Sequence, residues 1–397
     1  MKKIRLNFVQ LFLLIFIPVI IMSGIIGSLV YMKLNNTGTV TTTNNSHVNE
    51  FIKTYNKLID EYYEDLNEAE LIDAAISGML KYTGDDYTIY LNEDDTEDLN
   101  ERLDGTYEGI GISVTLNDNN EIYVAEVFDN SPAMLAGIKV NDVLVSINNV
   151  SLSNKTLKDA TDIIKKNKET KFNIVVKRDG VEKSFEIERK LLIVPALKSS
   201  IKEINNKKVG YVHLETFSNT LDTQLQTTLL EMEKDGIDSL IIDVRGNTGG
   251  YLTSCTNIIE MFLEKGKLMY TVTSKKDSID YKDETDDKRN YPIVVLIDGA
   301  SASASEILAG ALKYSYGATI IGLNSYGKGK VQTTGTLEDG TMIKYTSAKW
   351  FMPNGECVDE KGIKPDIEVK YSDKYIKEQI EENDDMLNEA LKILTNN

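Results

Sequence analysis

The sequence predicts an α/β core that follows a smaller β-rich unit, a helical region and one N-terminal membrane-spanning helix. After Leu192, strand-like apolar runs alternate with helical patterns, which is typical of βαβ units with largely parallel strands. Residues 105–191 consist mainly of short β runs separated by turn signals. A run of 27 uncharged residues lies between Arg5 and Lys33 and is long enough to cross a bilayer.

The composition excludes several classes of function. The 397 residues include 44 Lys and Arg against 62 Asp and Glu, and this net charge of −18 argues against a nucleic-acid ligand. The two histidines, His47 and His213, and the two separated cysteines, Cys255 and Cys357, supply no zinc-binding pattern. We therefore expect no metal and no cofactor. The cysteine spacing does not decide whether the two form a disulfide.

The N-terminal segment predicts a membrane anchor. Lys2, Lys3 and Arg5 precede the apolar run, so the positive-inside rule leaves the rest of the chain outside the cytoplasm. We interpret residues 1–33 as a cytoplasmic tip with a signal anchor and residues 34–46 as a polar linker. A weak cleavage site near Ser23–Ser28 leaves open a removed signal peptide and a secreted product.

Residues 47–104 predict a helical region. Apolar positions recur at helical spacing and indicate two amphipathic helices broken near Asn67. The acidic stretch LNEDDTEDLNERLDG, residues 91–105, lacks an apolar stripe, and we expect it to be irregular. A final helix is expected near Ile376–Leu394, within residues 373–397.

The β-rich unit, residues 105–191, opens with a glycine loop. In YEGIGISV, the backbone amides of Gly109, Ile110, Gly111 and Ile112 are candidates to hold a peptide's C-terminal carboxylate while the peptide adds a strand. The later string SPAMLAGIKVNDVLVSINN resembles the middle of a PDZ domain and strengthens that interpretation.

The α/β unit, residues 192–372, contains the segment DGASASASEILAGALK. Ser303 lies where a strand turns into a helix, a position that exposes a nucleophile and brings backbone N–H groups close to an oxyanion. The S-x-x-E spacing to Glu306 is also that of a capping box, and this segment alone favours capping over catalysis.

Two glycine-rich segments accompany this serine. Lys328 lies between Gly327 and Gly329, and a lysine with a lowered pKa can replace histidine as the base that activates serine. The same segment matches the opening of a P-loop, but Gly329 replaces the Mg²⁺-binding hydroxyl and a hairpin pattern follows, so we reject a P-loop here. Glycines 246, 249 and 250 follow the strand LIIDV and suit an oxyanion hole, although this segment alone favours an ordinary βα turn.

Taken together, these segments resemble the C-terminal processing peptidases, also called tail-specific proteases. The resemblance covers nearly all of the chain beyond the anchor. Five strings match motifs of the family's protease core in order: VGYVHLETFSNT, LIIDVRGNTGG, SASASEILAGAL, YGKGKVQ and KGIKPDIEV. The resemblance implies a crotonase/ClpP-like α/β protease core with an inserted PDZ domain, and it allows a homodimer through the terminal helices.

The resemblance also implies site residues. Ser303 corresponds to the nucleophile, Lys328 to the base and Gln332 to the residue that orients the lysine, whereas Lys330 does not match. The amides of Gly249 and Ala304 correspond to the oxyanion donors. Residues 246–248, Gly-Asn-Thr, stand where the family often has Asn-Asn-Pro, and Tyr314 stands where some members have a supporting Asp.

The resulting hypothesis is an extracytoplasmic serine endopeptidase that selects protein or peptide substrates by apolar C-terminal tails. One rival is a catalytically silent PDZ adaptor on the same fold. A second is a structural cell-surface protein with a nucleotide-binding core, which ATP titration would test.

Overall fold

The computed structural model describes residues 46–117, 119–165, 170–337 and 340–396. The chain divides into two units, one ending at Ala75 and one beginning at Ile76. The predicted membrane helix, residues 1–33, lies outside the described residues. In the described part of the chain, no helix combines the length and the apolar character needed to cross a membrane.

The predicted pair of N-terminal helices is confirmed as α2 (Ser46–Glu61) and α3 (Glu68–Lys81). Asn67 begins α3, since its side-chain oxygen accepts hydrogen bonds from the amides of Ala69 and Glu70 at 3.0 and 3.3 Å. The Tyr55 hydroxyl donates to the Glu68 carboxylate at 3.1 Å, which ties α2 to the start of α3. No residue of either helix is fully buried.

The acidic stretch after α3 is not irregular, and that prediction was wrong. Residues Glu93–Asp104 form helix α4. The Asn92 side chain accepts from the Asp95 amide at 2.8 Å, three acidic residues occupy the first turn, and Gly105 ends the helix at φ 67°. Cap, helix dipole and terminal glycine therefore stabilise a helix that has no marked apolar stripe.

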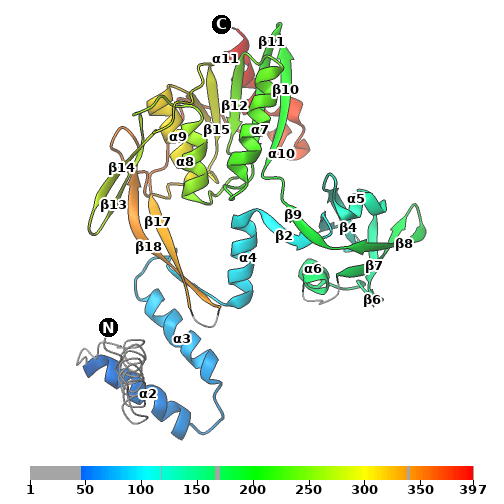
Figure 1. The fold of residues 1–397 in the computed structure, drawn as a ribbon, viewed down its shortest axis with the longest axis vertical. Coiled ribbons are helices and arrows are strands. Elements are labelled where there is room, and N and C mark those ends of the chain that lie inside the picture. The colour runs from blue at the N-terminus through cyan, green and yellow to red at the C-terminus, as the bar shows by residue number, and fades with distance from the viewer. Residues whose placement is uncertain (1–45, 118, 166–169, 338–339, 397) are drawn as a thin grey trace, which may run out of the picture. The chain divides into compact units, whose positions relative to one another are not determined.

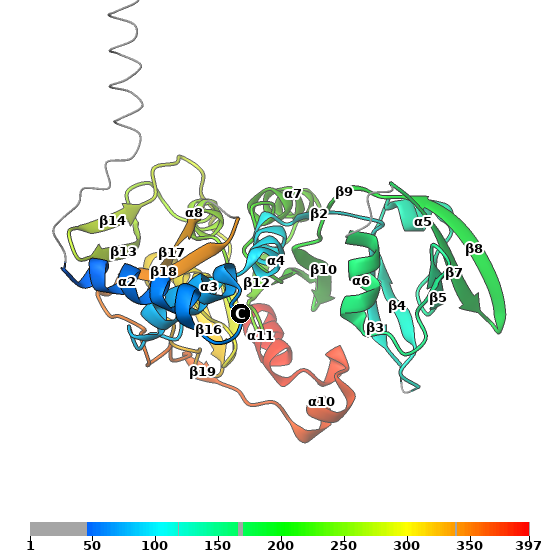
Figure 2. The ribbon, with the colours of Figure 1, turned by 90° about the horizontal axis from the view of Figure 1, so that it is seen from below.

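The β-rich unit is a six-stranded antiparallel sheet with two short helices (Figures 1 and 2). The pairing strands β2 (Thr106–Gly109) and β9 (Lys190–Ile193) lead into and out of it. The strands follow the order β3-β4-β5-β7-β8, with β6 paired to β5. Its elements are β3 (Ile112–Leu116), β4 (Ile122–Val127), α5 (Pro132–Ala136), β5 (Val143–Ile147), β6 (Val150–Ser151), α6 (Leu157–Lys165), β7 (Lys171–Arg178) and β8 (Val181–Glu188).

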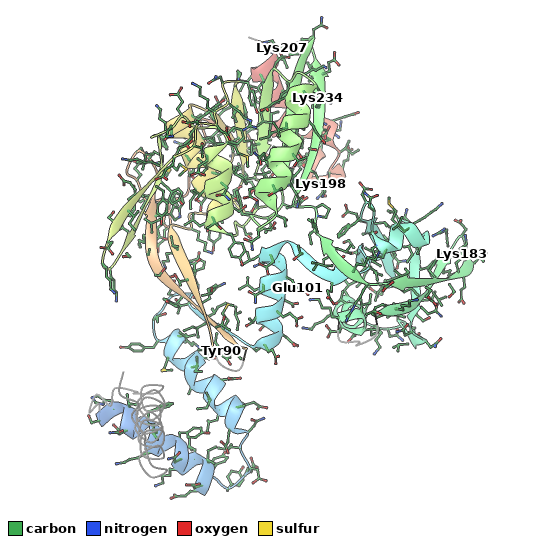
Figure 3. The ribbon with its side chains drawn as sticks, viewed as in Figure 1. Tyr90, Glu101, Lys183, Lys198, Lys207 and Lys234 are labelled. Carbon is green, nitrogen blue, oxygen red and sulfur yellow. The ribbon has the colours of Figure 1, made fainter. Side chains whose placement is uncertain are left out.

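The core of the α/β unit is a six-stranded sheet in the order β10-β11-β12-β15-β16-β19. Strand β10 pairs antiparallel with β11 and all other neighbours are parallel, so the predicted largely parallel arrangement is confirmed. The strands are β10 (Leu197–Ile204), β11 (Lys207–Leu214), β12 (Ser239–Asp243), β15 (Ile293–Ile297), β16 (Thr319–Gly322) and β19 (Ile367–Glu368). Charged side chains such as Lys183 on strand β8 and Lys234 are exposed to solvent (Figure 3).

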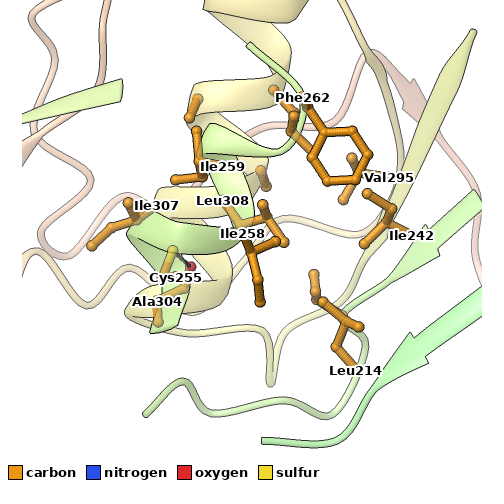
Figure 4. Packing of buried hydrophobic residues seen from close by; sticks show 14 of the residues in the cluster. Leu214, Ile242, Cys255, Ile258, Ile259, Phe262, Val295, Ala304, Ile307 and Leu308 are labelled. Atoms are coloured by element: carbon orange, nitrogen blue, oxygen red, sulfur yellow. Dashed lines mark hydrogen bonds between the residues drawn. The ribbon is translucent and has the colours of Figure 1, made fainter. Parts of the chain in front are cut away.

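Helices cover both faces of this sheet, and the side chains of β12 alternate between them. Leu240 and Ile242 pack toward α7 (Leu221–Lys234), α8 (Leu252–Glu260) and α9 (Ala304–Ala311), whereas Ile241 packs toward α11 (Asp385–Thr395). Figure 4 shows the first of these clusters, where α8 and α9 meet the strands. A π-helical turn, η1 (Leu312–Tyr316), extends α9.

The predicted single C-terminal helix is divided. Helix α10 (Asp373–Glu378) ends at Gln379 with φ 49°, and a short turn, η2 (Glu381–Asn383), separates it from α11. Asp384 begins α11 by accepting from the amides of Met386 and Leu387. The same carboxylate pairs with the buried Arg245 at 2.7 Å, which fixes the start of the helix on the sheet.

A second sheet completes the α/β unit. Its path is β1-β18-β13-β14, and β17 also pairs with β18. The strands are β1 (Ile89–Leu91), β13 (Leu268–Ser274), β14 (Ser278–Lys282), β17 (Lys330–Thr336) and β18 (Met342–Phe351). Strand β1 opposes Met342–Lys344 of β18, so the segment just before β1 reaches the hairpin that follows Lys328.

Candidate active site

Ser303 lies in the turn between strand β15 and helix α9. Its φ and ψ are 57° and −115°, an uncommon conformation for a residue with a side chain and one found at strained functional turns. Asp298 holds the turn, because its Oδ1 accepts hydrogen bonds from the amides of Gly246, Ala300 and Ser301 at 3.0–3.1 Å. The Ser303 side chain is only half-buried and lines a cavity.

The glycine loop after β12 lies against this turn. Gly249 has φ 102°, and a Cβ placed on it would lie 2.9 Å from the Cβ of Ser303. The Gly249 amide donates to Oδ1 of Asn247 at 2.8 Å. The predicted oxyanion donor is therefore adjacent to the serine, but Asn247 occupies its N–H in this structure.

Ala304, the other predicted donor, is the first residue of α9. A Cβ on Gly249 would lie 3.1 Å from the Ala304 nitrogen, so the two residues adjoin each other. The Ala304 carbonyl accepts from the Sγ of the buried Cys255 at 3.2 Å (Figure 4). Cys255 and Cys357 are both free thiols.

Glu306 connects the serine turn to the lysine segment. Its side chain is fully buried and accepts four hydrogen bonds. Oε2 accepts from the amides of Ser303 and Lys328 at 2.8 and 2.9 Å. Oε1 accepts from the Ser325 hydroxyl and the Gly327 amide at 2.6 and 2.7 Å. The carboxylate thus fixes the backbones of Ser303 and Lys328 relative to each other, as well as bonding the first turn of α9.

The side chain of Lys328 lies over an aromatic ring. Its Nζ is 4.7 Å from the centroid of Tyr87, while its carbonyl accepts from Nε1 of Trp350 at 2.9 Å. Burial lowers the pKa of Lys328, and the positive charge of Lys344 lowers it further. Within the described ranges, no hydrogen bond joins Lys328 Nζ to Ser303 Oγ.

Lys330 differs from Lys328 in its surroundings. Its Nζ forms an ion pair with Asp85 at 3.0 Å, and this hydrogen bond raises the pKa of Lys330. The second oxygen of Asp85 accepts from the hydroxyls of Thr88 and Thr346 at 2.7 and 2.6 Å. A lysine held charged in this way is unsuited to act as a base, in agreement with its lack of a match to the family motif.

Gln332 lies on β17, two residues after Lys330. Its amide nitrogen donates to the Lys330 carbonyl at 3.2 Å and is 3.5 Å from the Thr346 hydroxyl. It does not contact Lys328 through any hydrogen bond that the described residues show. The orienting role expected for Gln332 therefore stays a prediction.

One cavity of about 450 Å³ brings the five predicted residues together. Ser303, Lys328, Gln332, Gly249 and Ala304 all line it. Its other walls come from the glycine loop, helix α4 and the β17–β18 hairpin. In the part of the chain that the structure describes, no cluster of three His, Cys, Asp or Glu side chains could hold a metal ion.

The predicted carboxylate loop lies between strands β2 and β3. Gly109 ends β2, Ile112 begins β3, and Gly111 has φ 83°. Ile110 is 3% exposed and belongs to the core of the β-rich unit. The carbonyls of Ile110 and Gly111 accept from the amides of Ala133 and Phe128, which fixes the loop.

The sequence alone did not identify Glu306, Tyr87 or Asp85 as parts of the site. The S-x-x-E spacing pointed to Glu306 as a cap, but nothing in it indicated bonds to a segment about twenty residues further along the chain. Tyr87 and Asp85 carried no signal, since the pairing of β1 with β18 brings them to Lys328 and Lys330.

Family models match three parts of the chain. Peptidase family S41 matches residues 208–369, the PDZ domain matches residues 101–177, and the N-terminal domain of the activating protease CtpB matches residues 28–95. The S41 range contains all five predicted residues of the cavity, and the PDZ range contains Gly109–Ile112.

Similar proteins agree with these models. The carboxy-terminal processing protease CtpB of Bacillus subtilis is 36% identical over 348 residues, which cover 87% of this chain and 71% of that protein. A CtpA-like serine protease of Staphylococcus aureus is 32% identical over 372 residues, covering 93% and 74%. A solved S41 protease structure from Bacteroides fragilis covers 85% of this chain and 98% of its own, with 17% identity and a TM-score of 0.55, and it supports the fold. The chain therefore belongs to peptidase family S41, and it is a serine-type peptidase with a PDZ domain that resembles the C-terminal processing proteases.

Proposed function

We propose that the chain is an endopeptidase with Ser303 as nucleophile and Lys328 as general base. The observation that carries the proposal is the single cavity lined by Ser303, Lys328 and Gln332, with the amides of Gly249 and Ala304 beside the serine. The lowered pKa of Lys328 agrees with this role, because a lysine must be neutral to accept a proton.

The reaction follows from these groups. Neutral Lys328 takes the proton of the Ser303 hydroxyl while Oγ attacks the carbonyl carbon of the scissile peptide. The Gly249 and Ala304 amides stabilise the negative charge on the carbonyl oxygen. Collapse of this intermediate breaks the C–N bond, and the Lys328 ammonium gives its proton to the leaving amine.

The second half regenerates the enzyme. Lys328, neutral again, takes a proton from a water molecule that attacks the acyl carbon. The ester bond to Ser303 Oγ breaks, and Lys328 returns the proton to the serine. The Gln332 side-chain carbonyl would hold the lysine toward the serine after the glutamine leaves its present partner, the Lys330 carbonyl.

Under this proposal, the present positions of Lys328 and Asn247 are those of a resting site. Lys328 lies over Tyr87 without a bond to Ser303, and Asn247 occupies the Gly249 amide. Catalysis requires both groups to change partners. The shared attachment of the two backbones to Glu306 allows these side-chain changes without moving the serine away from the lysine.

We further propose that the PDZ domain holds the C-terminal tail of a protein substrate at Gly109–Ile112. The N-terminal apolar run and the positive charges before it support a single-pass anchor with the peptidase outside the cytoplasm. Protease treatment of intact cells, followed by detection of the C-terminal part, tests this topology.

A cleavage assay with matched variants tests the mechanism. The substrate is a loosely folded protein with an apolar C-terminus, and the variants are Ser303→Ala, Lys328→Ala and Lys330→Ala. We expect the first two to lose at least about 1,000-fold in kcat/KM, since each removes a group that acts in the bond-breaking steps. Lys330→Ala should retain far more activity. If Ser303→Ala or Lys328→Ala cleaves as fast as the parent, the mechanism is wrong.

A serine-reactive probe separates the peptidase from the silent adaptor. Labelling of the parent protein at Ser303, absent in Ser303→Ala, supports the proposal. Peptide binding without labelling or cleavage by the parent protein supports the adaptor.

A further inference from the structure

Two cations on the cavity wall take no direct part in the proposed proton transfers. Arg102 lies on α4, and Lys344 lies on β18 directly opposite Thr334 of β17. Both side chains line the cavity that contains Ser303 and Lys328. Figure 3 labels Glu101 on α4 and Tyr90 on β1, the strand whose Ile89 pairs with Lys344.

The fold fixes the backbone at Arg102, although the residue itself is exposed. The end of α4 is attached to the α/β core, because Asn219 donates its amide to the Leu103 carbonyl at 2.8 Å and its side chain to Asp104 at 2.9 Å. Leu99, Arg102 and Leu103 lie three and four residues apart, so one face of α4 points toward the cavity.

Neither cation has an anionic partner among the residues that the structure describes. Other lysines of the same sheet are paired, since Lys330 binds Asp85 at 3.0 Å and Lys349 binds Asp359 at 2.7 Å. Lys344 is half-buried, and burial and the nearby charge of Arg102 both lower its pKa. Two like charges that line one cavity without a counter-charge repel each other, and a bound anion would relieve this repulsion.

We propose that Arg102 and Lys344 form a carboxylate-binding subsite beside Ser303, so that the peptidase prefers substrates with a carboxylate close to the scissile bond. The inference rests on the proposed function and names a substrate class for it. The carboxylate can come from a Glu or Asp side chain or from the C-terminus of the substrate. Both sources present the same planar pair of oxygens to a guanidinium and an ammonium.

Another role for the two cations is to keep Lys328 neutral by repulsion. That role predicts equal losses for all substrates when either charge is removed. The subsite predicts losses that depend on a carboxylate in the substrate. The ratio of kcat/KM for paired peptides separates the two, because an effect on the base cancels in the ratio.

The test uses the full chain in a non-ionic detergent and peptides that differ at one residue. One set carries Glu or Gln at each position within three residues of the cleaved bond, with an amidated C-terminus. A second set carries Gln throughout and ends in a free or an amidated C-terminus at the same distances. We expect the parent protein to favour the carboxylate about tenfold at one position, as for a partly exposed charge-assisted contact.

Charge-removing and charge-keeping variants complete the design. In Arg102→Gln and Lys344→Gln, the ratio of kcat/KM between the carboxylate peptide and its neutral partner should fall toward one. Arg102→Lys and Lys344→Arg should keep most of this preference. Lys349→Gln, on the same strand but outside the cavity, should not change it. An absent preference in the parent, or one that survives in both neutral variants, would overturn the subsite.

A binding measurement keeps the inference separate from catalysis. Fluorescence anisotropy of the same labelled peptides on Ser303→Ala measures the carboxylate preference without turnover. The preference should be present there and lost in Ser303→Ala/Arg102→Gln. If no peptide is cleaved but this preference is found, the proposed function fails and the subsite stands. If peptides are cleaved without any preference in binding or cleavage, the subsite fails alone.

Discussion

Replacement of Glu306 by Gln tests whether one buried carboxylate holds the segments of Ser303 and Lys328 together. Glu306 accepts four hydrogen bonds of 2.6–2.9 Å, two on each oxygen. Glutamine keeps one oxygen and presents an amide donor where the other oxygen was. In either orientation, the NH₂ group of the glutamine therefore faces two groups that donate hydrogen bonds to the carboxylate in the parent protein.

The expected cost follows from this count. A hydrogen bond to a charged acceptor contributes about 1.5–3 kcal/mol, so the loss of two destabilises the local structure by about 3–6 kcal/mol. Hydrogen exchange at the Gly327 and Lys328 amides should be at least about 100-fold faster, because each tenfold corresponds to about 1.4 kcal/mol. We expect kcat/KM to fall by at least about 100-fold, since a small displacement of reacting groups is that costly.

Mass-spectrometric hydrogen exchange on the parent, Glu306→Gln and Glu231→Gln measures this effect peptide by peptide. Glu231 is an exposed glutamate of helix α7 that forms no side-chain hydrogen bond with the described residues, so its variant should behave as the parent. Unchanged protection of the peptide that contains Gly327 and Lys328, with kcat/KM within threefold of the parent, would refute this reasoning.

Two further predictions concern the partners of the catalytic groups. A cation–π contact favours the ammonium form by about 0.5–2 kcal/mol, so Tyr87→Leu should lower the pKa of Lys328. The rising limb of the kcat/KM–pH profile should then move to lower pH by about half to one and a half units. Tyr87→Phe keeps the aromatic ring, so its rising limb should stay where it is in the parent protein. Equal pH profiles for the two variants would contradict this prediction. Gly249→Ala should reduce kcat/KM by at least about 100-fold, because its Cβ would lie 2.9 Å from the Ala302 carbonyl oxygen at φ 102°. The control is Gly246→Ala, which also has a positive φ but open space around its Cβ, and it should lose less kcat/KM in the same assay.

The sequence predicted the α/β sheet because its central strands are continuous apolar runs. Both faces of β12 are covered, so Leu240, Ile241 and Ile242 are all fully buried. The strand sequence is therefore a continuous apolar run and does not alternate between apolar and polar residues. Helix α4 was missed for the opposite reason, since charged residues dominate its surface. Its end signals, Asn92 before the acidic turn and Gly105 after it, were present and carry more information there than periodicity.

The residues of the candidate site could be predicted only where they lie in short sequence motifs. Ser303 and Lys328 each lie in a short glycine- and serine-rich motif, and the structure brings both to one cavity. Tyr87 and Arg102 lie more than 200 residues before them. A strand pairing brings Tyr87 to Lys328, and a helix attachment brings Arg102 to the cavity. No spacing rule relates such positions, because their proximity is a property of the folded sheet.

The hydrogen bond between Asn247 and Gly249 has a consequence for how the oxyanion hole would act. A neutral substrate carbonyl that displaced the Asn247 oxygen would exchange one neutral hydrogen bond for another and gain little. An oxyanion forms a charge-assisted bond that is about twice as strong, so it gains from the same exchange. The Gly249 amide would therefore favour the tetrahedral intermediate over the bound substrate, and an interaction made more strongly in the transition state is one that raises kcat.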